Sequence, residues 1–316
     1  MMNKKILISI SILIGLIFLQ IAYGETGFNF DQTVLINLRL PKVMACIFVG
    51  GGLAIAGLLM QLFFQNPLAG PDILGVSSGA TFFVSVWLLA SATLPSYLIS
   101  WGVSIVSLLG SATVVTLLLI MLIKNQSKAT VLIIGILIAS VFSSATGLLI
   151  NSANAVEVKN FLVWSQGTFR RVYFEDLKVM IPAFVAILFL LRFYIKDFTL
   201  YAVGENYARS MGLNVLKTKF HFVALTSFLI AISIYYCGPI SFIGVVAPFL
   251  GRRILKTSNL NQLLMIVFIL GSGMSLISDL IQVLNPTLTL NTNVVLGFIG
   301  APIIIYYAIK QPELLG

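Results

Sequence analysis

The chain has 316 residues, of which 59% are apolar and only 9% are charged, and its mean hydropathy is +1.05. Soluble domains contain about 45–50% apolar and about 25% charged residues. No soluble fold of this length can bury so much apolar surface, so the composition excludes a soluble protein and predicts an integral membrane protein. The net charge of +9 does not indicate nucleic-acid binding, because basic residues in a membrane protein orient its loops.

Long apolar runs predict an all-α polytopic membrane protein with about ten transmembrane helices. A spanning helix needs about 20 apolar residues, or about 30 with its loop, so the chain has room for about ten. The runs lack the period-two alternation that is typical of a transmembrane β-barrel. The eighth run is short and opens on Gly-Pro, which indicates a half-helix and leaves nine spans as the alternative. The predicted spans are about 5–23, 43–62, 76–93, 97–123, 129–151, 178–196, 219–237, 240–251, 261–283 and 293–310.

The first apolar run has two interpretations. Lys4 and Lys5 precede it, and Ala22-Tyr23-Gly24 has the small residues of a signal-peptide cleavage site. We expect a retained first helix, because a polytopic protein can use its first span as the export signal; a cleaved signal peptide is the alternative. With the N-terminus inside, thirteen of the nineteen basic residues fall on inside loops, which favours cytoplasmic N- and C-termini.

Small residues gather on two spans and predict close helix packing, either in a bundled core or at a subunit interface. Two cysteines, Cys46 and Cys237, lie in apolar runs far apart in the sequence, and we expect free thiols in packed helices. The small residues are Gly50, Gly51, Gly52, Ala54, Ala56 and Gly57 on the second span, and Gly271, Gly273, Ser275 and Ser278 on the ninth.

Residues 61–80 interrupt the apolar pattern between the second and third spans. Two prolines and three glycines break any helix here, and Asn66, Asp72, Ser77 and Ser78 are suited to cap the ends. Irregular backbone at membrane depth is tolerated only inside protein or along a water-filled route. The segment therefore predicts a turn that lines or gates a pathway, with a plain capped connection as the alternative.

Four motifs, in order, resemble the permeases of ATP-driven importers of iron-siderophores, haem and vitamin B12, the FecCD/BtuC type. The first runs from Arg39-Leu40-Pro41-Lys42 through the glycine-rich span and Asn66-Pro67-Leu68-Ala69 to Ala80. The others are Val203–Asn214, Gly238–Pro248 and Gly297–Pro302. Because the resemblance covers nearly the whole chain, it implies one transmembrane permease domain over residues 1–316 with the type II ABC importer permease fold.

The resemblance implies an assembly. We expect a homodimer in the cytoplasmic (inner) membrane, surrounded by lipid, with two cytoplasmic ABC ATPase subunits and an extracytoplasmic solute-binding protein. The chain itself is expected to be no enzyme and to bind no cofactor, metal or nucleic acid. It lacks a Walker A lysine motif, so ATP-Mg belongs to the partner ATPases. The expected cargo is an iron chelate (a siderophore or haem) or cobalamin.

Residues 197–218 resemble the coupling segment that contacts the ATPase in this family. Glu205 near the start and Arg209 later suit a small helix with a complemented dipole, and Met211 and Leu213 offer an apolar contact to a soluble partner. A helix resting on lipid headgroups is the alternative. The coupling residues carried over from the resemblance are Gly204, Glu205, Asn206, Ala208, Arg209, Ser210 and Gly212.

The resemblance also implies a gate and a docking patch. Arg39 and Lys42 match the cations that contact the binding protein, although Lys42 stands where arginine is usual and loses the bidentate fork. Residues 284–293 lack the charges usual in the family, so Arg170 or Arg171 is expected to contribute; headgroup anchoring is the alternative. The path and gate candidates are Gln61, Asn66, Pro67, Leu68, Gly75, Ser77, Gln126 and Ser127, the last two with a plain polar turn as alternative.

Two other functions compete with an ABC permease. An ion-coupled secondary transporter of a small solute needs intramembrane carboxylates, and only Asp279 lies well inside a predicted span, where we favour a structural hydrogen-bonding role. An intramembrane hydrolase needs a nucleophile–base pair or a metal cluster. The single histidine, His221, begins a span and is expected to be interfacial and not a ligand.

Overall fold

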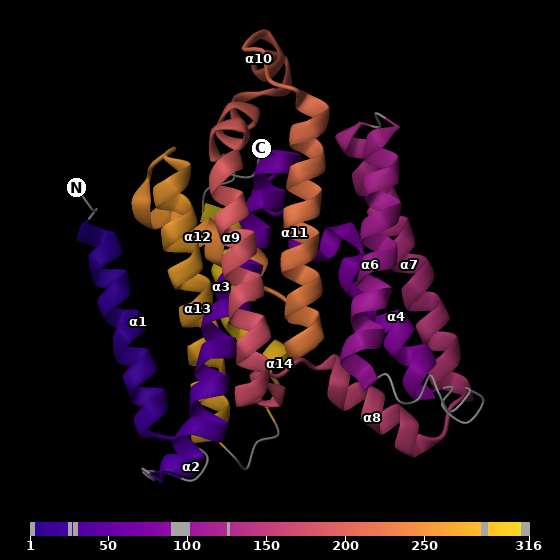
Figure 1. Ribbon diagram of the computed structural model, residues 1–316, viewed down its shortest axis with the longest axis vertical. Coiled ribbons are helices and arrows are strands. Elements are labelled where there is room, and N and C mark those ends of the chain that lie inside the picture. Colours follow the sequence, from indigo (N-terminus) through magenta and orange to yellow (C-terminus); the bar gives the residue numbers. More distant parts are fainter. Residues whose placement is uncertain are drawn as a thin grey trace.

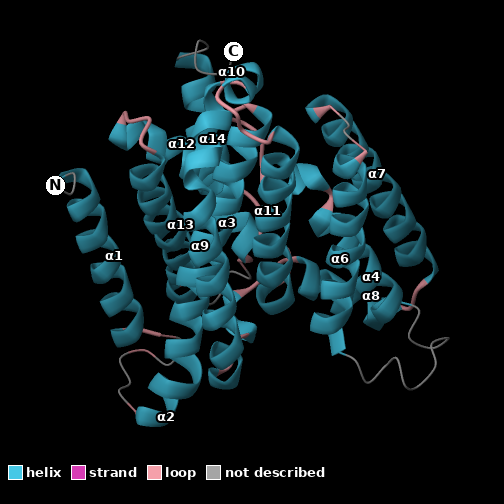
Figure 2. Cartoon of the chain, turned by 45° about the horizontal axis from the view of Figure 1, so that its top comes forward, coloured by secondary structure: helices cyan, strands magenta, loops and turns pink. Residues whose placement is uncertain are grey.

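The computed structural model describes residues 4–24, 27, 31–89, 102–124, 127–285 and 290–310, and every helix in it belongs to one upright bundle (Figure 1). Within these residues the regular elements are all helical and are joined by short loops (Figure 2). This confirms the all-α prediction, which follows from the need of a backbone in lipid to satisfy its own hydrogen bonds.

Each of the ten predicted spans contains a helix. Seven helices are long and apolar enough to cross a membrane, counting the turns that precede α3. Helices α4 and α12 are shorter, and so is the apolar stretch of α14, Thr292–Tyr306. The 13-residue α12 agrees with the predicted half-helix. Residues 90–93 and 97–101 of two predicted spans lie outside the described residues. The helices are α1 (Lys4–Ala22), α3 (Leu40–Phe64), α4 (Val76–Leu89), α6 (Gly102–Ile123), α7 (Lys128–Ser152), α9 (Phe174–Val203), α11 (Val215–Cys237), α12 (Ile243–Leu255), α13 (Leu260–Leu284) and α14 (Thr292–Lys310).

Helix extends into three regions that the sequence analysis assigned to loops. The chain is helical from α2 (Gln32–Val34) through the π-helical turn η1 (Leu35–Arg39) into α3. Pro41 lacks an N–H, and a widened turn before it accommodates the missing bond. Helix α8 (Ala155–Ser165) was not predicted, and α9 continues to Val203, so residues 197–203 of the predicted coupling segment continue a long helix.

Helix α3 lies at the centre of the bundle and contacts α9, α11, α12 and α13. Its glycines allow backbone to approach backbone: a Cβ atom on Gly50 would lie 2.7 Å from the carbonyl oxygen of Gly271 on α13. A Cβ atom on Gly57 would lie still closer to the carbonyl oxygen of Gly244 on α12. These contacts confirm that small residues pack the core, whereas Gly273 has no neighbour within 4 Å of its Cβ position.

Helices α4, α6, α7 and α8 form a second group beside this centre, on the right of Figure 1. Gly79 on α4 packs against Gly110 on α6, where a Cβ on Gly79 would lie 2.7 Å from the Gly110 carbonyl oxygen. Helix α11 contacts both α3 and α6 and so joins the two groups.

The two ends of the bundle differ. The short helix α10 (Glu205–Ser210) projects at one end, which also holds the start of α1, and α2 and α8 lie at the other end (Figure 1). We call these the α10 end and the α2 end. The placement agrees with an N-terminus on the side of the coupling segment.

The glycine contacts generate a matched pair of variants. Gly271→Ala places a methyl group against the Gly50 backbone, so we expect a loss of about 1–3 kcal/mol in the free energy of unfolding. Gly273→Ala, on the same helix with open space at its Cβ, serves as the control and should not destabilise. Thermal unfolding of both purified variants measures the difference, and equal melting temperatures would contradict the assigned packing.

Candidate functional site

Helix α10 is held between the ends of α9 and α11. Gly204 stops α9 with φ of +153°, a backbone conformation that side-chain-bearing residues rarely adopt, and it lets the chain turn directly into α10. Ala208, on the inner side of α10, is fully buried. Its backbone oxygen accepts the N–H of Leu213 at 3.0 Å. The predicted coupling residues therefore form one short helix that is anchored on its inner side.

Charges fix α10 to the neighbouring span. One carboxylate oxygen of Glu205 accepts from Arg209 Nη2 at 2.9 Å and from Lys219 Nζ at 3.1 Å. Lys219 is buried on α11, whereas Arg209 is exposed. The sequence predicted Glu205 and Arg209 on one small helix with a complemented dipole, but it predicted neither their ion pair nor the contact with Lys219, fourteen residues after Glu205.

The outward side of α10 carries apolar and polar side chains. Tyr207 is 49% exposed and Met211 is 59% exposed, beyond the ends of the spanning helices. Exposed apolar groups next to polar ones mark contact surfaces for other proteins. Asn206, Ser210 and Gly212 are exposed on the same segment.

An aromatic cluster lies where the end of α3 packs between α9 and α11. The rings of Phe63 at the end of α3, Tyr201 on α9 and Phe222 on α11 pack with centroids 5.3–6.2 Å apart. His221 stacks on Tyr194 at 3.9 Å between α9 and α11. The cluster joins the end of α3 to α9 and α11, the two helices that flank α10, and the histidine packs as an aromatic ring.

The turn after α3 is held by local hydrogen bonds. Asn66 Oδ1 accepts the N–H of Leu68 at 2.8 Å, and Ser77 Oγ donates to Asp72 Oδ1 at 3.0 Å across the 3-10 turn η2 (Pro71–Leu74). Gly75 has φ of +72°, and a Cβ there would lie 2.9 Å from the backbone of α7. Pro67 is half-buried and Leu68 is exposed. The predicted path residues thus form a compact capped turn packed on α7.

Gln61 links this turn to α12. Its Oε1 accepts from Arg252 Nη1 at 2.5 Å, and its Nε2 donates to the Val245 carbonyl oxygen at 3.3 Å. The pair gives Arg252 a partner inside the bundle. Ser127 Oγ caps α7 by accepting the N–H of Thr130 at 3.1 Å, and Gln126 lies outside the described residues.

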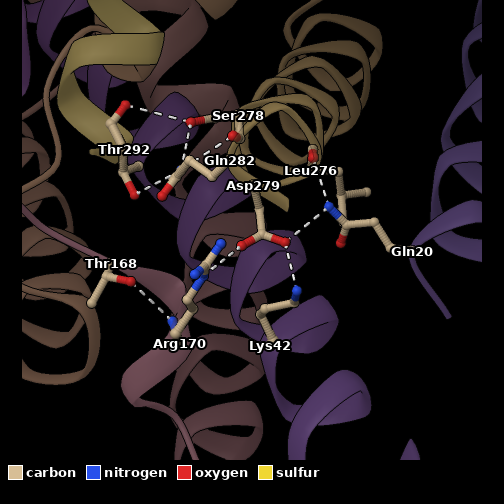
Figure 3. Close-up of polar contacts among 9 residues, drawn as sticks. All are labelled: Gln20, Lys42, Thr168, Arg170, Leu276, Ser278, Asp279, Gln282 and Thr292. Carbon is tan, nitrogen blue, oxygen red and sulfur yellow. Dashed lines mark hydrogen bonds and ion pairs between the residues drawn. The ribbon is translucent and has the colours of Figure 1, made fainter. Parts of the chain in front are cut away.

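A buried charge cluster lies toward the α2 end (Figure 3). Asp279 on α13 is 1% exposed, and its carboxylate contacts Lys42 Nζ of α3 at 2.8 Å and Arg170 Nε at 3.6 Å. Gln20 Nε2 of α1 donates to the same carboxylate at 3.3 Å. The hydrogen bond from Gln20 agrees with the hydrogen-bonding role expected for Asp279, and the Lys42 partnership, which joins residues 237 positions apart, was not predicted.

The structure buries both cations that the sequence analysis placed in the docking patch. Lys42 is 6% exposed, and Arg39 is 3% exposed. Arg39 donates to the carbonyl oxygens of Ile21, Ala22 and Gly27 at 2.7–3.0 Å, so it closes the connection after α1. Both side chains were expected at the surface and are buried instead. Residues 32–39 are helical, which brings Arg39 against the end of α1. Their docking role stays a prediction.

Within the described residues, no three His, Cys, Asp or Glu side chains gather where they could hold a metal ion. Cys46 and Cys237 are buried free thiols, as predicted. The features with chemical content are therefore the projecting helix α10, the Gln61–Arg252 link with its turn, and the Asp279 charge cluster.

Together, the bundle and its projecting helix define a multi-pass helical membrane protein. The chain belongs to the FecCD transport family, whose pattern it matches over residues 4–310. It is 31% identical over 281 residues to the Fe(3+) dicitrate transport system permease protein FecD of Escherichia coli, covering 88% of this chain and 86% of the relative. It is 28% identical over 276 residues to the vitamin B12 import system permease protein BtuC of Escherichia coli, covering 87% and 83%.

A solved structure of an inward-facing transporter, assigned to the metal-chelate type of ABC transporters, has the same fold. The TM-score is 0.86, with 22% identity over 97% of this chain and 99% of the other. This likeness supports the arrangement of the helices.

The charge cluster predicts a sharp contrast between two lysines. Lys42→Met leaves the Asp279 carboxylate buried with Gln20 and the more distant Arg170, so we expect a loss of about 3–5 kcal/mol in the free energy of unfolding. Lys178→Met breaks an exposed ion pair with Glu175 and should lose at most about 1 kcal/mol. Thermal unfolding of the purified variants measures both.

A double variant separates the lost ion pair from lost packing. Lys42→Met with Asp279→Asn removes the uncompensated charge and should recover most of the stability lost by Lys42→Met alone. Equal loss in the single and double variants, or equal loss at Lys42 and Lys178, would contradict the pairing.

Proposed function

We propose that the chain is the permease subunit of an ABC importer in the cytoplasmic membrane, carrying an iron chelate, haem or cobalamin with energy from separate ATPase subunits. Membership of the FecCD transport family supports this proposal, as do relatives named for iron dicitrate and vitamin B12 transport. ATP-Mg then belongs to the partner ATPases, and the permease chain is not an enzyme.

The observation that carries the proposal is helix α10. It projects from the end of the bundle, exposes Tyr207 and Met211, and is tied to the spans through Glu205 and Lys219. A helix docked in a groove of a soluble partner uses such an apolar face, and its buried anchors transmit the motion of the partner. The ATPase is the partner we assign to it, which places the α10 end in the cytoplasm.

Helix α7 supports a pathway shared with a second copy of the chain. Most of α7 is exposed, and one long side carries Ser140 and Ser144 among apolar residues, with open space above Gly147. Hydroxyl groups and small residues suit helix contact or a polar route better than lipid. We propose a homodimer with α7 at the route, and Gln61, the 66–77 turn, Gln126 and Ser127 at its constriction near the α10 end.

The α2 end is the proposed contact for an extracytoplasmic solute-binding protein. Arg170 is the partly exposed member of the charge cluster, and the buried Lys42 contacts the same Asp279 carboxylate. Arg39 is buried at the connection after α1. Cations at such a surface steer an acidic partner and set its orientation. In this arrangement the buried Arg39 and Lys42 affect docking indirectly, because they hold the surface of the α2 end in its shape and contribute to its charge.

The ion-coupled alternative is weakened by the partners of Asp279. An ion carrier needs a carboxylate that can bind and release its cation. Lys42 already contacts Asp279 at 2.8 Å in a buried site, so this carboxylate is neutralised by a fixed charge.

The proposal is tested at Tyr207. Tyr207→Asp places a charge on the exposed apolar side of α10 without touching its buried anchors, and we expect at least tenfold less ATPase subunit to co-purify with the chain. Tyr173→Asp, at an exposed tyrosine before α9 at the opposite end, is the control and should retain the ATPase. ATPase retained in Tyr207→Asp would count against the coupling role.

A further inference from the structure

An apolar groove opens between α3, α9 and α13, three helices that contact one another. Its volume is about 580 Å³, and apolar side chains from all three helices line it, among them Ile55, Leu191 and Leu264. All three helices are long and apolar enough to span a membrane. The groove therefore faces lipid and not water.

Cations stand at one end of this groove. Arg192 of α9 lines it and donates from Nη1 to Asn261 Oδ1 at 3.2 Å. Asn261 is the second residue of α13, so the guanidinium lies at the level where that span begins, toward the α10 end. Lys196 is exposed one helical turn further, and residues four apart share a helix face.

The charge of the site is positive. None of the residues that line the groove is acidic, and Asn261 occupies only one of the five guanidinium N–H groups of Arg192. Two other N–H groups of the same guanidinium can donate to a phosphate, which guanidinium groups bind in bidentate fashion. Basic sites between spanning helices at headgroup level recognise anionic lipids.

We propose that the groove binds one anionic phospholipid, with an acyl chain along Ile55, Leu191 and Leu264 and the phosphate at Arg192 and Lys196. The long apolar lining of the groove favours a lipid over a free phosphate, because an inorganic anion would leave that lining uncovered. The two cations select an anionic headgroup over a zwitterionic one, whose own ammonium group opposes them. The site lies on the α10 side of the membrane and is separate from α7 and from the charge cluster.

Native mass spectrometry of the purified full chain tests the site. The chain is titrated with phosphatidylglycerol and, separately, with phosphatidylcholine of the same acyl chains. We expect preferential binding of phosphatidylglycerol, weakened about thirtyfold in Arg192→Gln/Lys196→Gln, because each lost cation near a headgroup weakens binding about fivefold. Lys124→Gln removes an exposed lysine at the end of α6, away from the groove, and should change nothing.

A second pair of variants tests the groove itself. Met265→Trp narrows it from its exposed rim and should weaken phosphatidylglycerol binding, whereas Phe189→Trp on the exposed face of α9, outside the lining, should not. Equal binding of the two lipids, or binding unchanged in both the cation and the groove variants, would overturn the proposal. Displacement of the lipid by millimolar inorganic phosphate would also overturn it and assign a free-anion site.

Discussion

Backbone contact between α3 and its neighbours is the constraint on which the rest of the structure depends. In lipid, apolar side chains gain little from leaving one apolar surface for another, so helices associate where small residues let them approach. Gly50 against Gly271 and Gly57 against Gly244 provide this approach toward α13 and α12. A side chain at any of these positions would separate the helices and move both ends of α3.

The two ends of α3 carry different polar features. Lys42 near its start neutralises Asp279, and Gln61 near its end binds Arg252. Phe63 then connects the same end to the aromatic cluster under α10. These contacts connect the end of α3 to α9 and α12 and its start to α13.

Much of the fold was predictable because lipid restricts the possible structures. Run lengths identified ten helices, and glycine clusters identified the packed faces. The π-turn at residues 35–39 was not predictable, because charges at Arg39 and Lys42 indicate a loop unless their partners are known. Lys196 and Asp197 likewise ended the predicted sixth span early, although the helix continues to Val203.

The candidate site was predictable where its residues are close in sequence. Glu205 and Arg209 stand four apart on one short helix, and Asn66 to Ser77 form a local turn. Partners brought together from distant helices were missed, namely Lys219 for Glu205, Arg252 for Gln61 and Lys42 for Asp279. The separation of such residues along a single sequence does not indicate that they pair, because tertiary packing alone sets the distances between them.

The most direct test of the account is to label and cross-link a cysteine at Ser210, an exposed α10 position, in a chain whose native thiols are both buried. The account predicts that a membrane-impermeant thiol reagent reaches Ser210→Cys only from the cytoplasmic side. It also predicts that a short cross-linker joins this cysteine to an ATP-hydrolysing subunit. Labelling from the outside of intact cells, or an assembly that contains no such subunit, would contradict it.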